Sequence, residues 1–152
     1  GNAFSDTGIT SFVANALTTI NSADFCKCSK LERVEMNSLK ILADKNNYNQ
    51  GVFHQCTSLV YVSIPLVEKI GSYAFYDCSA LSSIVWGGGI TSIGANAFAN
   101  CTSLKKLKIP ESVTVIDPQA FAGCSKDLTI VCKSGTTAET VALRYEFKIE
   151  LE

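Results

Sequence analysis

A short segment recurs along this chain at a nearly constant interval. The pattern Phe-x-x-Cys-(Ser/Thr)-x-Leu-x-x-apolar-x-apolar begins at Phe25, Phe53, Phe75 and Phe98, and a shortened copy begins at Phe121. The intervals between these phenylalanines are 28, 22, 23 and 23 residues. A fixed period in this range is the signature of a solenoid, in which each repeat stacks on its neighbours. Function in such a protein usually lies on a stacked surface and not in a single pocket.

The last two apolar positions of each copy, such as Leu107 and Ile109, are separated by one residue. This alternation has the period of a β-strand with one buried face. Pro65 and Pro110 follow directly after the second apolar position, where proline ends a strand because it has no N–H to donate. Each copy therefore predicts one short strand.

Two irregularities interrupt the repeat. The interval of 28 residues holds an insertion within residues 43–51, whose polar and glycine-containing composition is typical of a surface loop. Tyr48 lies in this loop and is a candidate contact, because loops often carry function. The sequence Gly87-Gly88-Gly89 replaces the Pro-Glu-Ser of residues 110–112, and the backbone freedom of glycine predicts a looser turn there.

The end of the chain departs from the repeat. After Cys124 the pattern contracts, and a segment from Thr137 reads as a short capped helix. Residues 145–151 alternate apolar and charged side chains, as an exposed edge strand would. We therefore predict a solenoid of about six repeats over residues 1–133, the first one truncated, and a capping segment over residues 134–152.

The net charge and the lengths of the apolar runs argue against several classes of function. The net charge is −1 and no long run of Lys or Arg occurs, which argues against a nucleic-acid partner. No apolar run approaches the roughly 18 residues of a membrane span, and no signal peptide is visible. Gly1 opens the chain without Met, and Asn2-Ala3-Phe4 looks like the middle of a repeat, so we expect an expression-derived glycine on a truncated product.

The repeat resembles the BspA-type, or Treponema-like, leucine-rich repeat. The consensus of that family is Leu-x-x-Ile-x-Ile-Pro-x-x-Val-x-x-Ile-Gly-x-x-Ala-Phe-x-x-Cys. Residues 81–101 and 104–124 match it almost throughout, and the resemblance covers about residues 4–130. The departures from the consensus lie at Gly87 and in the long second repeat.

The resemblance implies an α/β repeat solenoid. In this family a right-handed leucine-rich-repeat array carries short parallel strands on its concave face and mostly irregular structure on its convex side. It further implies an extracellular or cell-surface protein that takes part in adhesion. The implied partners are a protein or a glycan, with host extracellular matrix among them, and no cofactor. The family has no shared catalytic residues.

Five of the seven cysteines occupy one repeat position. Stacking would place them in a column at the strand spacing of about 4.7–4.9 Å. Parallel Cβ vectors do not converge as a disulfide requires, so we expect buried, reduced thiols that act as small apolar side chains with weak S–H donors. The five are Cys28, Cys56, Cys78, Cys101 and Cys124.

The other chemically active residues form no site. Cys26 lies off the column, and we expect it to be the most reactive thiol, although Cys132 stays an alternative. Cys26 and Cys28 have half of a zinc-site spacing, but no second cysteine pair completes it. His54 should point outward as a solvated side chain, since pairing with Cys56 as a nucleophile would need an accessible thiol. We therefore predict neither a catalytic nor a metal site.

The residues between the inward ones of each strand should share the concave face. Two interpretations stand: a partner-binding face with a basic patch at Lys105, Lys106 and Lys108, or an ordinary solvated sheet. By register the face carries Arg33, Glu35, Tyr61, Ser63, Ser83, Val85, Lys106 and Lys108.

The sequence thus predicts a non-enzymatic module that binds a protein or a glycan through its concave face or its inserted loop. A structural spacer with no specific ligand is the alternative. A contiguous apolar or aromatic patch on the concave face would favour binding, and a uniformly polar face would favour the spacer.

Overall fold

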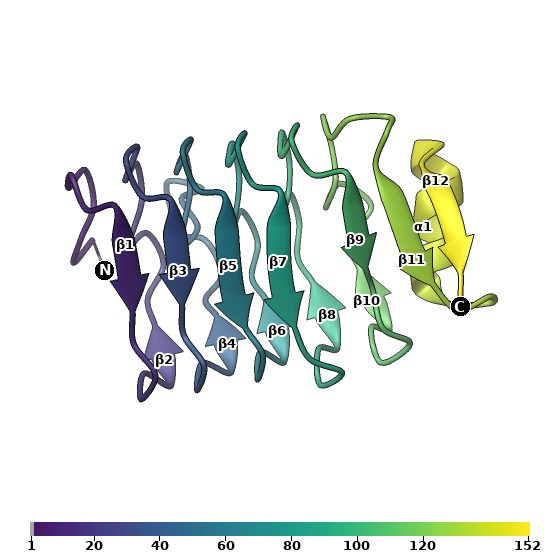
Figure 1. The fold of residues 1–152 in the computed structure, drawn as a ribbon, viewed down its shortest axis with the longest axis horizontal. Coiled ribbons are helices and arrows are strands. Elements are labelled where there is room, and N and C mark those ends of the chain that lie inside the picture. Colours follow the sequence, from purple (N-terminus) through teal and green to yellow (C-terminus); the bar gives the residue numbers. More distant parts are fainter. Residues whose placement is uncertain (1) are drawn as a thin grey trace.

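The computed structural model describes residues 2–152 as a stack of similar turns, with the chain termini at opposite ends (Figure 1). This arrangement confirms the predicted repeat solenoid with parallel strands. Gly1, which we expected to be an added residue, lies outside the described residues.

The predicted strands line one side of the stack. Their outward residues alternate with buried ones, such as Val34, Val62 and Leu107, because successive side chains of a strand point to opposite faces. All pairings are parallel and hold equivalent repeat positions in register, so that Arg33, for example, lies beside Tyr61. The strands are β1 (Ser11–Val13), β3 (Arg33–Glu35), β5 (Tyr61–Ile64), β7 (Ser83–Trp86), β9 (Lys106–Lys108) and β11 (Thr129–Cys132).

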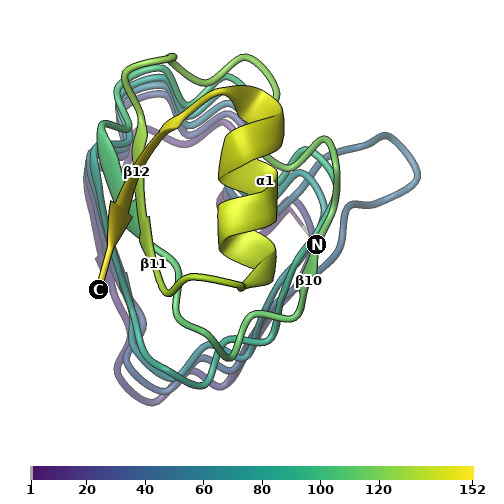
Figure 2. The same cartoon turned by 90° about the vertical axis from the view of Figure 1, so that its right-hand side faces the viewer.

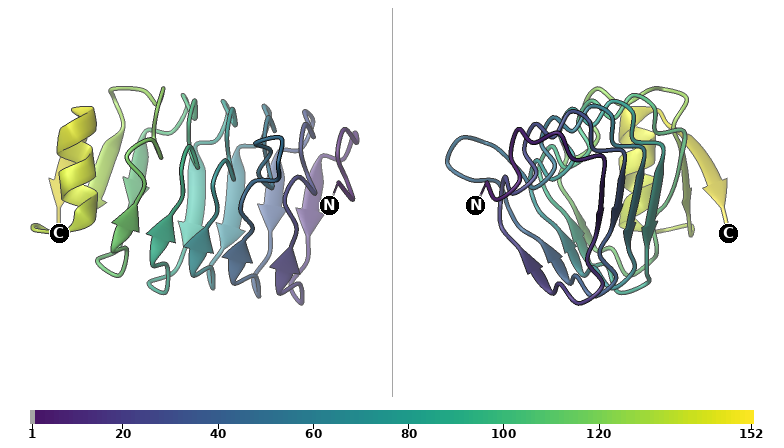
Figure 3. Two further views of the ribbon diagram at one scale, coloured as in Figure 1. Left: turned by 180° about the vertical axis from the view of Figure 1, so that it is seen from behind. Right: turned by 60° about the vertical axis from the view of Figure 1, so that its left-hand side comes forward.

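A second parallel sheet, which the sequence analysis did not predict, forms another side of the solenoid (Figure 3). Each of its strands has two residues, and the second residue is buried. Two residues are too few to show the alternation by which a strand is recognised in a sequence. The strands are β2 (Thr19–Ile20), β4 (Ile41–Leu42), β6 (Lys69–Ile70), β8 (Ser92–Ile93) and β10 (Val115–Ile116).

Stacked phenylalanine rings run through the core. Phe25, Phe53, Phe75, Phe98 and Phe121 are fully buried, and neighbouring rings lie nearly parallel with centroids 5.2–5.4 Å apart. Offset stacking at this distance is favourable and is compatible with the strand spacing. The rings therefore fix the repeat distance together with the two sheets.

The column of cysteines beside these rings is hydrogen-bonded. Each thiol donates to the carbonyl oxygen of the phenylalanine one repeat earlier, and the S···O distances are 2.9–3.2 Å. For example, Cys78 donates to Phe53, whose carbonyl also accepts the N–H of Cys56 in its own turn. A buried carbonyl has two lone pairs, and the thiol satisfies the second. The structure thus confirms free thiols that act as weak donors in the core.

A helix and a strand follow the last turn. Helix α1 (Thr137–Tyr145) covers the end of the stack, and strand β12 (Lys148–Leu151) pairs with β11 (Figure 2). The N-cap is Thr136, whose side chain accepts the N–H of Glu139, while Thr137 is already helical. Ala138, Val141 and Ala142 turn the apolar side of the helix inward. The division into two units at residue 133 stays a prediction.

Candidate functional site

The strand face consists of the outward side chains of β1, β3, β5, β7, β9, β11 and β12. All eight residues predicted for the concave face lie on it, in two rows set by the strand register. One row contains Arg33, Tyr61 and Ser83, and the next contains Glu35, Ser63 and Val85. Lys106 and Lys108 lie on a separate sheet of β9, β11 and β12. That these residues bind a partner stays a prediction.

Arg33, Glu35 and Tyr61 form a fixed cluster on this face. The guanidinium carbon of Arg33 lies 4.0 Å from the centroid of the Tyr61 ring, within the range of a cation–π contact. Its Nη2 lies 2.7 Å from Glu35 Oε1, and its Nε donates to the same oxygen at 2.8 Å. One edge of the guanidinium is held by Glu35 and one face lies on the Tyr61 ring, so the cluster is tied together and its charges are balanced.

Two of the three lysines of the predicted basic patch are paired with acidic side chains. Lys106 lies 2.7 Å from Glu150, and Lys108 lies 2.6 Å from Glu152. Both glutamates come from β12 or the residue after it, which reaches across β11 because β12 extends the sheet. Sequence analysis anticipated an edge strand here but had no information on its register.

The strand face is interrupted between β7 and β9. Within the described residues, β7 pairs with β5 and β9 pairs with β11, but β7 and β9 share no ladder. The carbonyl of Lys108 accepts the indole N–H of Trp86 at 2.8 Å, where the other repeats have a backbone N–H donor. The side chain of Trp86 therefore occupies the place of a backbone hydrogen bond. The equivalent backbone bonds run from Ala14 to Glu35, from Met36 to Ser63 and from Ile109 to Val131.

A hollow of about 520 Å³ lies at this interruption. Ile84, Val85, Trp86 and Pro110 supply apolar lining. Ile84 is only partly buried, whereas its equivalents on the neighbouring strands are fully buried. The edge of the Trp86 ring system packs against buried Phe98 at a centroid distance of 5.9 Å. The volume lies within the range of about 300–1,000 Å³ that is usual for ligand pockets.

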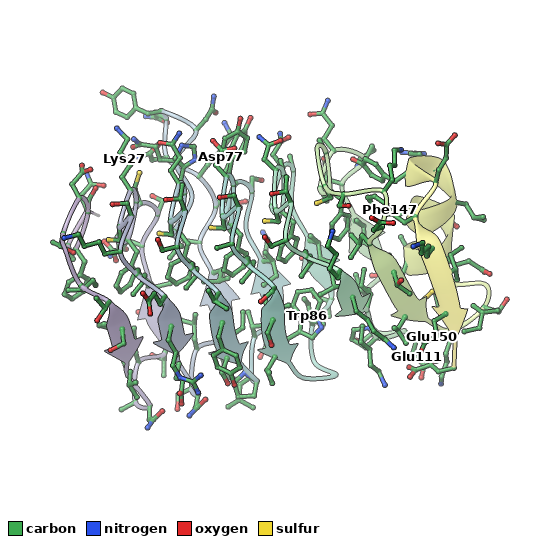
Figure 4. All side chains as sticks on the ribbon, turned by 45° about the horizontal axis from the view of Figure 1, so that its top comes forward. Lys27, Asp77, Trp86, Glu111, Phe147 and Glu150 are labelled. Carbon is green, nitrogen blue, oxygen red and sulfur yellow. The ribbon has the colours of Figure 1, made fainter. Side chains whose placement is uncertain are left out.

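Charged side chains surround the hollow. Lys108 is paired with Glu152, and Lys133 lies 2.9 Å from Glu111. Figure 4 places Trp86 beside β7 and Glu111 near the same ends of the following strands. The site thus has an aromatic wall and a rim that carries both signs of charge.

The residue type at one repeat position explains the hollow. Trp86 takes the inward position that Met36, Ile64 and Ile109 fill in other repeats, and its indole is too large for that space. The following turn is also more tightly packed than expected, because a Cβ on Gly87 would lie 2.3 Å from the carbonyl oxygen of Pro65. Gly87 is therefore required for close approach, and the predicted looser turn is wrong at this residue. The size of Trp86 was the sequence signal for the hollow, and we missed it.

The inserted loop projects from the side of the solenoid away from β11 and β12 (Figure 2). Tyr48 in this loop is 83% exposed. His54 does not stand free in solvent as predicted, because its ring is half-buried and stacks on Tyr76 with centroids 5.0 Å apart. Burial lowers the pKa of His54 below its usual value, which favours the neutral ring at pH 7.

The cysteines offer no accessible nucleophile at the strand face. Cys26 is 1% exposed, and burial raises the pKa of its thiol, so the prediction that it is the most reactive cysteine is wrong. Burial likewise raises the pKa of Cys78 and Cys101, and it raises the pKa of Cys124 to about 12. Cys124 is the only one of the column that is partly exposed, because it belongs to the last turn.

Two further observations concern the described residues 2–152. No group of three or more His, Cys, Asp or Glu side chains in that range is arranged to hold a metal ion. None of its helices has the length and apolar character that crossing a bilayer would require.

Comparison with known protein families agrees with the repeat solenoid seen in the structure. The sequence matches the model of the BspA type Leucine rich repeat region in 6 copies, over residues 1–126 and 46–149. No curated protein matches it.

Solved structures of bacterial leucine-rich-repeat proteins share the fold. The leucine-rich-repeat protein of T. pallidum superposes with a TM-score of 0.72 at 26% identity, over 80% of this chain and 58% of that one. A protein from Eubacterium ventriosum gives 0.71 at 25% identity, over 82% and 33% of the two chains. A leucine-rich cell surface protein from Faecalibacterium prausnitzii gives 0.59 at 26% identity, over 99% and 50%. This chain therefore spans between a third and three fifths of their lengths.

Proposed function

Since this chain belongs to the BspA type leucine-rich-repeat family, we propose that it is a non-catalytic binding module of a cell-surface or secreted protein that attaches to a protein partner. The family supports a role in protein interaction in general. The similarity to a cell surface protein of F. prausnitzii supports the location and, with it, a role in adhesion. Because the chain covers only part of its neighbours, these statements concern this module.

The hollow beside Trp86 carries the proposal. A spacer needs only an unbroken stack, and the strand face would then repeat the same ladder from end to end. Here one tryptophan opens the ladder and lines a partly apolar hollow at β7, the edge strand of the sheet that also carries the Arg33–Tyr61 cluster. Trp, Tyr and Arg are the residue types that most often dominate the binding energy of protein interfaces.

The spacer remains the second candidate. The strand face away from the hollow is mostly polar, and its ion pairs are exposed, so each contributes little to stability or to binding. This polar surface is what a spacer would show.

Two substitutions test the proposal against a panel of purified extracellular-matrix proteins. Tyr61→Ser and Trp86→Ile each install a residue that a neighbouring repeat carries at the same position, Ser83 and Ile64 respectively. We expect either change to weaken binding of a captured matrix protein by about 1–2 kcal/mol or more, roughly tenfold in Kd. Surface plasmon resonance with immobilised matrix protein gives the measurement.

Deletion of residues 45–50 is the matched control, because it removes the inserted loop on another side and restores a period of 22 residues. It should leave strand-face binding unchanged. A panel without any bound protein would favour the spacer. Equal affinity of the two substituted variants and the parent chain would show that recognition lies elsewhere than the strand face.

A further inference from the structure

The inserted loop is held in one conformation by its own amides. The side-chain oxygen of Asn46 accepts the backbone N–H groups of Tyr48 and Gln50, at 2.9 and 3.1 Å. Its side-chain nitrogen donates to Gln50 Oε1 at 2.9 Å, and Lys45 donates to Asn49. Asn46 thereby organises the whole loop around itself. A loop fixed in this way loses little conformational freedom when a ligand binds to it.

The loop is also anchored on the next repeat. Asp44 accepts the backbone N–H and the hydroxyl of Ser72, at 2.8 and 3.0 Å, and these bonds lower the pKa of its carboxyl. At the other end of the loop, the backbone of Gly51 passes so close to Tyr73 that a Cβ there would lie 2.1 Å from the Tyr73 carbonyl oxygen. Both ends of the loop therefore meet the segment around Tyr73.

An aromatic cluster lies at this junction. The rings of Tyr73 and Tyr76 have centroids 5.2 Å apart, and His54 stacks on Tyr76. Lys45 of the loop lies 5.7 Å above the centroid of the Tyr73 ring. The next repeat has Asn96 and Ala99 at the two tyrosine positions. The cluster thus occurs only beside the insertion, and the two irregularities form one surface, here named the tyrosine face: residues 44–50 with His54, Tyr73 and Tyr76.

The backbone of Tyr73 has a conformation that is unusual for a tyrosine. Its φ is 60°, in the left-handed region that bulky side chains rarely adopt. In three other repeats the same position holds Asn2, Ala23 and Asn96, also with positive φ, and asparagine tolerates this region best among them. Tyrosine disfavours the backbone conformation that this position has. A role of the Tyr73 ring at the surface accounts for the presence of tyrosine here.

Apart from Asp44 and Lys45, whose charges are opposite, the hydrogen-bonding groups that the face offers are uncharged. Among residues 2–152, Asp44 is paired with Lys69 and Ser72, and Asp77 with Asn100. Lys45 is engaged by Asn49 and Tyr73. The hydroxyls of Tyr48, Tyr73 and Tyr76 have no partner within the described chain, which leaves phenols and amides exposed beside ring faces.

We propose that the tyrosine face binds a neutral carbohydrate chain. A pyranose ring has a face of C–H groups that packs on an aromatic ring and equatorial hydroxyls that need both donors and acceptors. Phenols and amides supply both, and tyrosine with asparagine also forms the adaptable contact surface of antibody loops. The local balance of charge favours an uncharged ligand over an acidic polysaccharide. The tyrosine face lies on another side of the solenoid from the strand face. Its proposed ligand is therefore independent of the function proposed for the strand face.

Affinity gel electrophoresis tests the proposal directly. The parent chain is run in native gels that contain soluble starch, yeast mannan, mixed-linkage β-glucan or, as an acidic comparison, polygalacturonate. We expect retardation by at least one neutral polysaccharide and none by polygalacturonate. The double variant Tyr73→Asn/Tyr76→Ala, which copies Asn96 and Ala99 of the next repeat, should reduce the apparent affinity at least about tenfold. Its Tm should stay close to that of the parent chain, because the backbone relief by asparagine offsets the lost ring contacts of Tyr73 and Tyr76.

Further variants keep the result decisive. Tyr48→Ser, at the exposed tip of the loop, gives a second reduction if the double variant does not fold. Tyr61→Ser on the strand face must leave retardation unchanged. No retardation by any of the neutral polysaccharides overturns the proposal. Loss of matrix-protein binding in the double variant, without binding of a polysaccharide, would assign the face to a protein instead.

Discussion

The phenylalanine and cysteine columns run unbroken through the solenoid, whereas the ladder on the strand face stops between β7 and β9. In the columns, every repeat supplies the same ring, and every thiol reaches the carbonyl of the repeat before it. On the strand face, a single large residue, Trp86, replaces a backbone hydrogen bond with its own. Both regions are built from the same turns, and the strand face is interrupted where one turn carries Trp86.

The difference shows how stability and function are separated in this array. A solenoid is held by contacts between neighbouring repeats, so a change at one position of one repeat acts locally. The columns keep Phe75 and Phe98 stacked at 5.2 Å although the strands of the same two repeats have parted. The core can therefore carry an open strand face without losing its register.

Alkaline pH should disrupt the columns most strongly. Burial raises the pKa of the Cys78, Cys101 and Cys124 thiols, so the native state keeps protons that the unfolded chain releases near its usual pKa of about 8.5. Above that pH the unfolded state binds fewer protons, and the free energy of unfolding falls as pH rises. Each thiol contributes about 1.4 kcal/mol per pH unit until its native pKa is reached, and the contribution is fully present below about pH 8.5. Urea denaturation between pH 8 and 11 gives the slope.

Cys101→Ser provides the control for this dependence. The hydroxyl does not ionise in this range, so the slope should become shallower by about 1.4 kcal/mol per pH unit while contributions from Lys and Tyr stay the same. An unchanged slope would show that the buried thiols do not govern the alkaline response.

Removing one ring from the phenylalanine column should have the next largest effect. Phe98→Ala deletes a fully buried ring that contacts Phe75, Phe121 and Trp86, and should cost about 3–5 kcal/mol. Phe4→Ala, at the partly exposed first turn, should cost less. Chemical denaturation measures both. A loss below about 1 kcal/mol for Phe98→Ala would contradict the view that the column holds the array together.

Closing the strand face should change stability least. Trp86→Ile restores the residue type of the neighbouring repeats and should allow a backbone bond from residue 86 to Lys108. The net change in the free energy of unfolding should stay within about 1.5 kcal/mol, since a lost aromatic contact is offset by a regained ladder bond. Slower hydrogen exchange at Lys106 and residue 86 would report closure. Unchanged exchange there would mean that the interruption has another cause.

The sequence predicted those parts of the structure that recur in every repeat. The spacing of Phe98, Leu104 and Leu107 recurs in neighbouring copies, and this recurrence specified the turn, the buried face of each strand and the thiol column. It could not specify the second sheet, because two residues such as Lys69 and Ile70 show no period. Nor could it place Glu150 beside Lys106, since that pair depends on the register of a segment outside the repeat.

The candidate surfaces were only partly predictable for the same reason. Arg33 and Tyr61 fall on one face by strand alternation, and their contact follows from the register. The hollow arises from the volume of Trp86, and the cluster of His54, Tyr73 and Tyr76 arises from turns without a regular period. Such features become visible only when a repeat is compared with its neighbours position by position.

The thiol column also affects how reversibly the protein unfolds. While the array is stacked, every sulfur of the column donates its proton to a carbonyl, and all but that of Cys124 are buried. Once a turn opens in an oxidising solution, several free thiols from adjacent repeats become reactive together. A disulfide or a sulfenic acid formed at that moment cannot restore the S–H bond to the phenylalanine carbonyl. Refolding of this solenoid should therefore be complete under reducing conditions and decline with the time the unfolded chain spends in air.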